Sequence, residues 1–147
     1  MLIIGDSMPN QNSVTESREK VEQFLVELKS ILSSPNFNPA RDLDILPKKK
    51  NEDMFDPCTT ANTLLALGFD NEDVRNELLK IGVEDYAETL IDVMDASLPP
   101  FYVFYRDIQS REVYIKVKIR DSVTGKVFCI SFHFARYPAP NPLPYST

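Results

Sequence analysis

Apolar residues follow two different periods along this chain, and the change of period separates a helical part from a strand part. Between residues 15 and 33 they recur every three or four positions, which predicts an amphipathic helix. From residue 101 onward they recur at every second position, which predicts strands near residues 101–108, 111–120 and 126–135. Helices followed by an antiparallel sheet predict an α+β fold, with the helices packed on one face of the sheet.

Short helices are predicted in the middle of the chain from their capping residues. Thr59 or Thr60 supplies a hydroxyl for the start of the first, and Gly68 ends it. Asp70 caps the second, where Asp73 at the third helical position also favours the helix dipole. A third short helix is predicted from the apolar residues Val83, Tyr86, Leu90 and Ile91.

The length of 147 residues suits one domain with a core of its own. Residues 1–14 are predicted to be a flexible N-terminal tail, and residues 15–147 a single α+β domain. Within that domain, the proline-containing segment 35–57 is expected to be a connector. Residues 136–147 hold four prolines in a short run and are expected to be an extended C-terminal tail.

Charge is unevenly distributed along the chain. The net charge of −6 argues against a nucleic-acid-binding protein, but residues 101–147 carry seven Lys and Arg against three Asp and Glu. Two distant cysteines and a single histidine suggest neither a disulfide framework nor a metal site, so no metal or cofactor is expected. No apolar run reaches the ~18 residues of a membrane helix. We expect a cytoplasmic protein without a membrane partner.

The last two predicted strands have different residue types on their two faces. Aliphatic residues alternate with a polar row made of Tyr114, Lys116, Lys118 and Arg120. On the final strand, Phe128, Ile130, Phe132 and Phe134 are expected to share the inward face, leaving Cys129, Ser131 and His133 opposite. Burying both apolar rows together allows two registers across a short hairpin loop, with Tyr114 opposite either His133 or Ser131.

The polar row has the chemical groups that RNA cleavage without a metal needs. A histidine transfers protons near neutral pH, cationic side chains stabilise a phosphorane, and a tyrosine stacks on a base or donates a proton. The candidate catalytic residues are His133, Tyr114 and Lys116. The candidate RNA contacts are Lys118, Arg120, Arg106 and Arg136. The alternative interpretation is a sheet with one solvated face, where Lys and Arg are common.

Three stretches of the sequence together resemble a known family. They are LGFDNEDVRNELLKIGVEDYAETL at residues 67–90, EVYIKVKI at residues 112–119 and ISFHFA at residues 130–135. In this order they resemble the MqsR family of toxins from bacterial toxin–antitoxin systems, over about residues 59–135. The resemblance implies a RelE-like α+β fold and a metal-independent mRNA endonuclease, or mRNA interferase, that a cognate antitoxin protein neutralises.

The resemblance also assigns some site residues. The functional tyrosine of the family's V-Y-x-K strand falls on Tyr114, with Lys116 beside it, and the basic residue after S-F falls on His133. A family lysine falls near Glu88, where the charge is reversed, and a family glutamine has no counterpart in the strand FYVFY.

The sequence leaves two functions open. The first is a toxin that acts as an endoribonuclease on mRNA through the predicted open sheet face. The second is a non-catalytic protein-binding module of the same fold, which grips a partner through the sheet face or the acidic helices. An enzyme acting on a small molecule is not supported, because no Gly-rich phosphate loop and no nucleophile motif is present.

Overall fold

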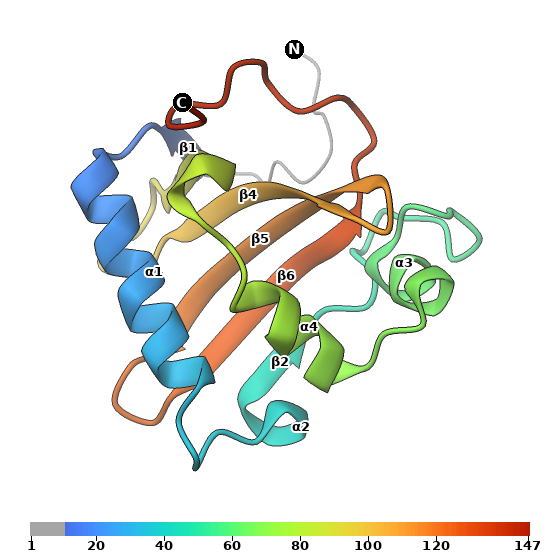
Figure 1. Ribbon diagram of the computed structural model, residues 1–147, viewed down its shortest axis with the longest axis horizontal. Coiled ribbons are helices and arrows are strands. Elements are labelled where there is room, and N and C mark those ends of the chain that lie inside the picture. Colours follow the sequence, from blue (N-terminus) through green and yellow to red (C-terminus); the bar gives the residue numbers. More distant parts are fainter. Residues whose placement is uncertain (1–10) are drawn as a thin grey trace.

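A mixed β-sheet forms the centre of the computed structural model, which describes residues 11–147 (Figure 1). In this part of the chain the sheet has six strands in the order β1-β3-β4-β5-β6-β2. In chain order the strands are β1 (Gln11–Val14), β2 (Leu43–Ile45), β3 (Tyr86–Asp92), β4 (Phe101–Ile108), β5 (Arg111–Asp121) and β6 (Lys126–Phe134). All neighbours are antiparallel except β2 and β6, which are parallel.

Four α-helices accompany the sheet in the described residues. They are α1 (Arg18–Leu32), α2 (Pro39–Asp42), α3 (Thr60–Leu67) and α4 (Asn71–Leu78). Helices α1 and α4 lie on the same face of the sheet, as Figure 1 shows, while α3 lies beside β6. The predicted α+β class is therefore confirmed.

The helix ends follow the predicted capping chemistry. The hydroxyl of Thr59 accepts a hydrogen bond from the backbone of Asn62 at the start of α3. Gly68 ends this helix with a φ of 73°, the left-handed conformation that glycine adopts at little cost. Asp70 and Asp73 form a reciprocal capping box at the start of α4. These local signals mark where both helices begin and where α3 ends.

The main core lies between the helices and one face of the sheet. Helix α1 contributes Val21, Phe24, Leu25, Leu28 and Leu32 to it, at the predicted spacing. From β5 the aliphatic row of Val113, Ile115, Val117 and Ile119 faces the same core, as predicted. The ring of Phe24 stacks on Tyr102 with 3.9 Å between ring centroids, which fixes α1 over β4.

Three predicted elements are wrong. The third short helix is a 3₁₀ turn at Val83–Asp85 followed by strand β3, because the segment pairs with β4 on one side and β1 on the other. Residues 11–14 of the predicted tail form β1, while residues 1–10 lie outside the described part of the chain. The connector 35–57 contains α2 and β2, and β2 extends the sheet at β6.

The pairing of β5 with β6 changes register in its middle. Tyr114 is directly opposite His133, which confirms one of the two predicted registers at this end. Ile130 is then left unpaired between Ser131 and Cys129, so that a β-bulge shifts the rest of β6 by one residue. Cys129 consequently faces the main core, whereas Phe128 and Ile130 face the other side of the sheet. The predictions for these three side chains are wrong.

No helix within residues 11–147 has the length and apolar character needed to cross a lipid bilayer.

Candidate functional site

The face of the sheet opposite α1 and α4 brings together most of the predicted site. Tyr114, Lys116 and Lys118 extend from β5, and His133 extends from β6 beside them. The rings of Tyr114 and His133 are stacked, with centroids 5.3 Å apart and planes 14° from parallel. Tyr105 of β4 packs its ring edge-on against Tyr114, also at 5.3 Å. We call Tyr105, Tyr114, Lys116, Lys118 and His133 the second-face cluster.

This second face is not open at its centre, which corrects the prediction. His133 is 1% exposed and Lys116 is fully buried. A second, smaller apolar cluster also occupies this face, built from Leu90, Phe101, Val103 and Ile130. The bulge contributes to it, since it turns Ile130 and Phe128 toward this side. Two of the three candidate catalytic side chains therefore lie out of contact with solvent.

Cationic side chains on the second face rest on aromatic rings. The Nζ atoms of Lys116 and Lys118 lie 5.2 and 4.7 Å from the ring centroid of Phe101. Nζ of Lys116 also lies 3.2 Å from the side-chain oxygen of Gln11. Burial, and next the charge of Arg120, lower the pKa of Lys118. Lys118 is only partly buried, so its ammonium group is the most accessible charge of the second-face cluster.

Arg120 stands at the end of the same row and is exposed. Its guanidinium lies 4.2 Å from the ring centroid of Phe128 and forms an ion pair of 3.0 Å with Asp44 of β2. Because the pair is exposed, its contribution to stability is small. Arg120 can exchange Asp44 for another anion at little cost.

Arg106 is on the wrong side of the sheet for the role predicted from sequence. Its guanidinium bonds the carbonyl oxygen of Lys80 and the carboxylate of Asp85 at 3.2 and 3.0 Å, on the helix side. Side chains on β4 point alternately to the two faces of the sheet. Arg106 is two positions after Phe104 and shares its face, and Phe104 belongs to the main core. Arg106 therefore belongs to the packing of the 3₁₀ turn and is separated from the second-face cluster by the sheet.

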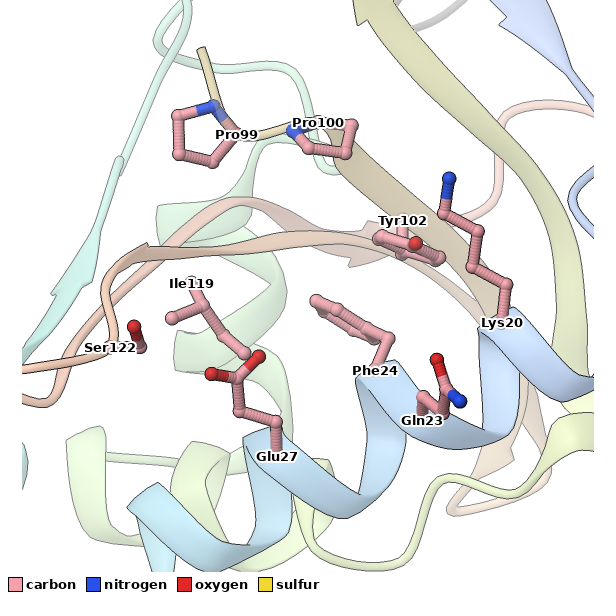
Figure 2. Close-up of a pocket in the computed structure, with 9 residues that line it drawn as sticks. All are labelled: Lys20, Gln23, Phe24, Glu27, Pro99, Pro100, Tyr102, Ile119 and Ser122. Atoms are coloured by element: carbon pink, nitrogen blue, oxygen red, sulfur yellow. The ribbon is translucent and has the colours of Figure 1, made fainter. Parts of the chain in front are cut away.

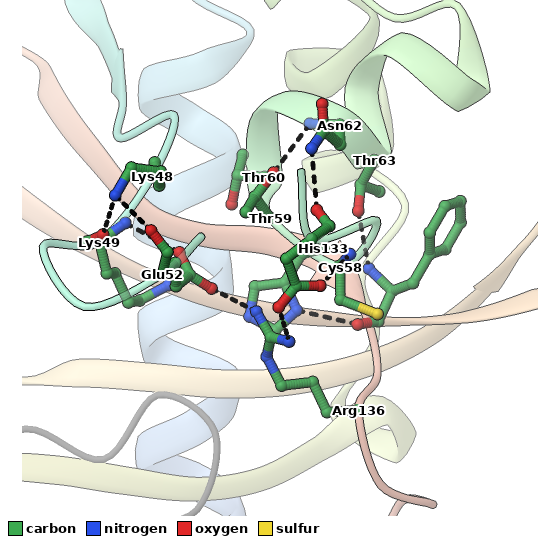
Figure 3. Close-up of polar contacts among 12 residues, drawn as sticks. Lys48, Lys49, Glu52, Cys58, Thr59, Thr60, Asn62, Thr63, His133 and Arg136 are labelled. Carbon is green, nitrogen blue, oxygen red and sulfur yellow. Dashed lines mark hydrogen bonds and ion pairs between the residues drawn. The ribbon is translucent and has the colours of Figure 1, made fainter. Parts of the chain in front are cut away.

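Arg136 follows β6 and does lie near His133. Its two terminal nitrogens bond the carboxylates of Glu52 and Asp56, as Figure 3 shows for Glu52. The backbone N–H of Cys58, and then Arg136 and His133, lower the pKa of Asp56 against the opposing effect of burial. Asp56 therefore links the guanidinium and the imidazole electrostatically. Nδ1 of His133 lies 3.0 Å from the carbonyl oxygen of Phe134.

Glu52 and Asp56 are the site residues that sequence reasoning missed. They belong to the stretch NEDMFDP, which has no helical or strand period and predicts only a connector. Their position beside Arg136 depends on a contact across 80 or more positions of sequence. No local signal identifies such a pairing.

A separate pocket of about 390 Å³ lies on the helix side of the sheet (Figure 2). Helix α1 forms one wall of it, and Pro99, Pro100 and Ser122 form the opposite side. None of the candidate catalytic or RNA-binding residues lines it.

Among residues 11–147, no three His, Cys, Asp or Glu side chains are grouped so as to hold a metal ion. The chain matches no protein-family model, no curated protein and no solved structure.

Proposed function

We propose that this protein is a cytoplasmic toxin of a bacterial toxin–antitoxin system, with a RelE-like fold, that cleaves mRNA without a metal. The observation that carries the proposal is the stacked pair of Tyr114 and His133, with Lys116 and Lys118 on the same sheet face. The resemblance of three ordered sequence stretches to the MqsR family supports it independently. A cognate antitoxin protein is the expected partner that holds the toxin inactive.

The proposed reaction is a phosphoryl transfer within the RNA strand. The 2′-oxygen attacks the neighbouring phosphorus and loses its proton, while the 5′-oxygen leaves and gains one, giving a 2′,3′-cyclic phosphate and a 5′-hydroxyl. His133 serves as the proton-transfer group and Tyr114 as the hydroxyl that donates to the phosphate or the leaving oxygen. Lys116 stabilises the negative charge of the phosphorane. Lys118 and Arg120 contact the flanking phosphates, with Arg136 beside the imidazole.

Because His133 and Lys116 are buried, the reaction requires the site to open when RNA binds. Glu52 and Asp56, which lie beside His133 (Figure 3), are held by ion pairs to Arg136, and such contacts exchange more readily than a packed apolar core. Catalytic geometry often tightens only in the complex with substrate, so burial in the free protein is compatible with the proposed role.

Regulated expression in a bacterium tests the proposal. Expression of the parent protein should arrest growth, while His133→Ala and Tyr114→Phe should relieve the arrest. Tyr137→Phe, which removes the hydroxyl of an exposed tyrosine, is the control and should remain toxic. Purified protein should cleave RNA in the presence of a chelator and leave cyclic phosphate ends. Equal toxicity of the parent and both site variants would refute the assignment.

A second function, a non-catalytic protein-binding module of the same fold, is favoured by the burial of His133 and Lys116. Its surface would include the exposed apolar side chains of Met54, Phe55 and Leu65. The two functions differ in one measurement. A binding module leaves RNA intact at any protein concentration, yet forms a stable complex with the product of a neighbouring gene.

A further inference from the structure

The segment of residues 47–58, which we call the strap, lies over the part of the sheet that contains His133 (Figure 3). Its two ends are close together, since the N–H of Ala61 donates to the carbonyl of Pro47 at 2.9 Å. Just before it, Leu46 donates to the carbonyl of Cys129 at 3.1 Å. The strap is therefore a closed loop fixed at its base to β6 and to α3.

The tip of the strap is not held by apolar packing. Met54 and Phe55 are 67% and 83% exposed. Its contacts are polar: Nζ of Lys48 bonds two strap carbonyls, and the side-chain amide of Asn62 bonds the carbonyls of Met54 and Asp56. Toward the sheet, Cys58 at the end of the strap packs against the main core, and Glu52 and Asp56 form ion pairs with Arg136. The ion pairs at Arg136 thus hold the strap in its position over the imidazole.

We propose that the strap is an intramolecular competitor of RNA, in which Glu52 and Asp56 occupy the guanidinium of Arg136 until a phosphodiester replaces them and uncovers His133. This inference rests on the proposed function, because it names the phosphate-binding step of the same site. The two carboxylates offer oxygens to both terminal nitrogens of the guanidinium, as a phosphate group does with two of its own. A phosphate bound there lies beside the only histidine of the chain.

The charges on the strap favour this exchange. When Arg136 binds a phosphate instead, the carboxylates of Glu52 and Asp56 lose their counter-charge. They then repel each other and the bound phosphate. That repulsion moves the strap away from the sheet. Lys48, Lys49 and Lys50 are at the start of the same segment and add positive charge for the RNA strand. Binding of one phosphate to the guanidinium of Arg136 therefore also exposes His133.

The single histidine makes the opening measurable with diethyl pyrocarbonate, which acylates accessible imidazole. The double variant Glu52→Gln/Asp56→Asn should be modified about tenfold faster than the parent, as expected for losing a charge-assisted hydrogen bond that holds the closed state. Glu22→Gln, which breaks the ion pair with Arg18 on α1, is the matched control and should react at the parent rate. A double variant that is folded by circular dichroism and reacts no faster than the parent overturns the inference.

Arg136→Gln is the second variant, and it removes the same ion pairs by replacing the guanidinium. It should also speed modification of His133, but its affinity for an uncleavable 2′-deoxy-substituted RNA should fall. The double carboxylate variant should bind the same oligonucleotide more tightly than the parent. Opposite changes in affinity support competition at Arg136, and equal changes overturn it. Faster modification and tighter binding without cleavage by any variant would uphold the strap and refute the proposed nuclease.

Discussion

Tyr114 and His133 face each other on adjacent strands, with their rings stacked at a centroid distance of 5.3 Å. This contact lies on the unshifted side of the bulge, where the register is one of the two that alternation allows. Tyr114→Phe keeps the stacked ring and removes only the hydroxyl, so its effect reports on chemistry and not on packing. The Tyr114→Phe variant therefore distinguishes a catalytic role of the hydroxyl from a structural role of the ring.

RNA binding should depend on one face of the sheet only. We predict that Lys118→Ala and Arg120→Ala each weaken binding of an uncleavable RNA and each lower the slope of log affinity against log salt by about 1. Arg106→Ala is the matched control, because Arg106 is paired on the helix side. Fluorescence titrations over a range of salt concentrations measure these slopes. A reduced slope for Arg106→Ala would place the RNA elsewhere.

The bulge at Ile130 gives two phenylalanines of the same strand different roles. We predict that Phe132→Ala, at a fully buried position of the main core, lowers the free energy of unfolding by about 3–5 kcal/mol. Phe128→Ala should cost clearly less, since Phe128 is only partly buried in the smaller cluster. Urea denaturation of the two variants gives both values. Equal losses would mean that both side chains face the same core.

Two threonine hydroxyls of α3 protect the free edge of β6. The backbone N–H groups of Phe132 and Phe134 donate to Thr60 and Thr63 at 3.1 and 3.0 Å, beyond the end of β2. Replacing either threonine by valine leaves a buried donor without a partner, which should cost about 1–3 kcal/mol. Thr15→Val, at an exposed position, is the control. Urea denaturation measures the change, and a cost below that of the control would contradict it.

Asp42 should make stability depend on acid pH. Arg41 first, then the backbone of Asn38 and Lys126, hold the pKa of this carboxyl well below its usual range. The unfolded chain therefore binds its proton at higher pH than the folded one, so stability is lost as pH falls below about 4. Asp42→Asn should be less stable than the parent at pH 7, and the difference should shrink in acid.

Urea titrations between neutral and acid pH test this dependence. Asp107→Asn, which changes an exposed carboxyl on β4, is the control. A constant difference between parent and Asp42→Asn at every pH would show that the carboxylate charge is not what stabilises the fold.

The hairpin turn between β4 and β5 places two residues other than glycine in the left-handed backbone conformation. Gln109 and Ser110 both have positive φ angles, 52° and 66°, a conformation that glycine adopts with less strain. We predict that Ser110→Gly raises the free energy of unfolding by about 0.5–1 kcal/mol. Gln109 is left in place because its amide donates to the carbonyl of Leu67. Ser122→Gly in the next turn, where φ is not positive, should give no gain.

The sequence predicted most of the elements whose signals are local. The strands β4, β5 and β6 and the helices α1, α3 and α4 were found from period and capping residues. Strand β3 was mistaken for a helix because its apolar residues fit a helical period, and only pairing with β1 and β4 decides the question. The two shortest strands have too few residues to show alternation.

The candidate site was predicted in part for the same reason. Alternation on β5 placed Tyr114, Lys116, Lys118 and Arg120 on one face, and the structure places them there with His133. The burial of Lys116 and His133 on this face could not be foreseen, because the bulge at Ile130 and the strap both add cover to it (Figure 3). A bulge adds a residue without any pattern in the sequence that marks it.

Strand β6 is the last strand along the chain, yet it pairs with both β5 and β2. During synthesis on the ribosome, residues 43–45 must therefore wait for about 80 further residues before their partner emerges. Such distant pairing makes folding slow and leaves the main core unfinished in the nascent chain. Because His133 belongs to β6, its ring reaches Tyr114 only when β6 has paired with β5.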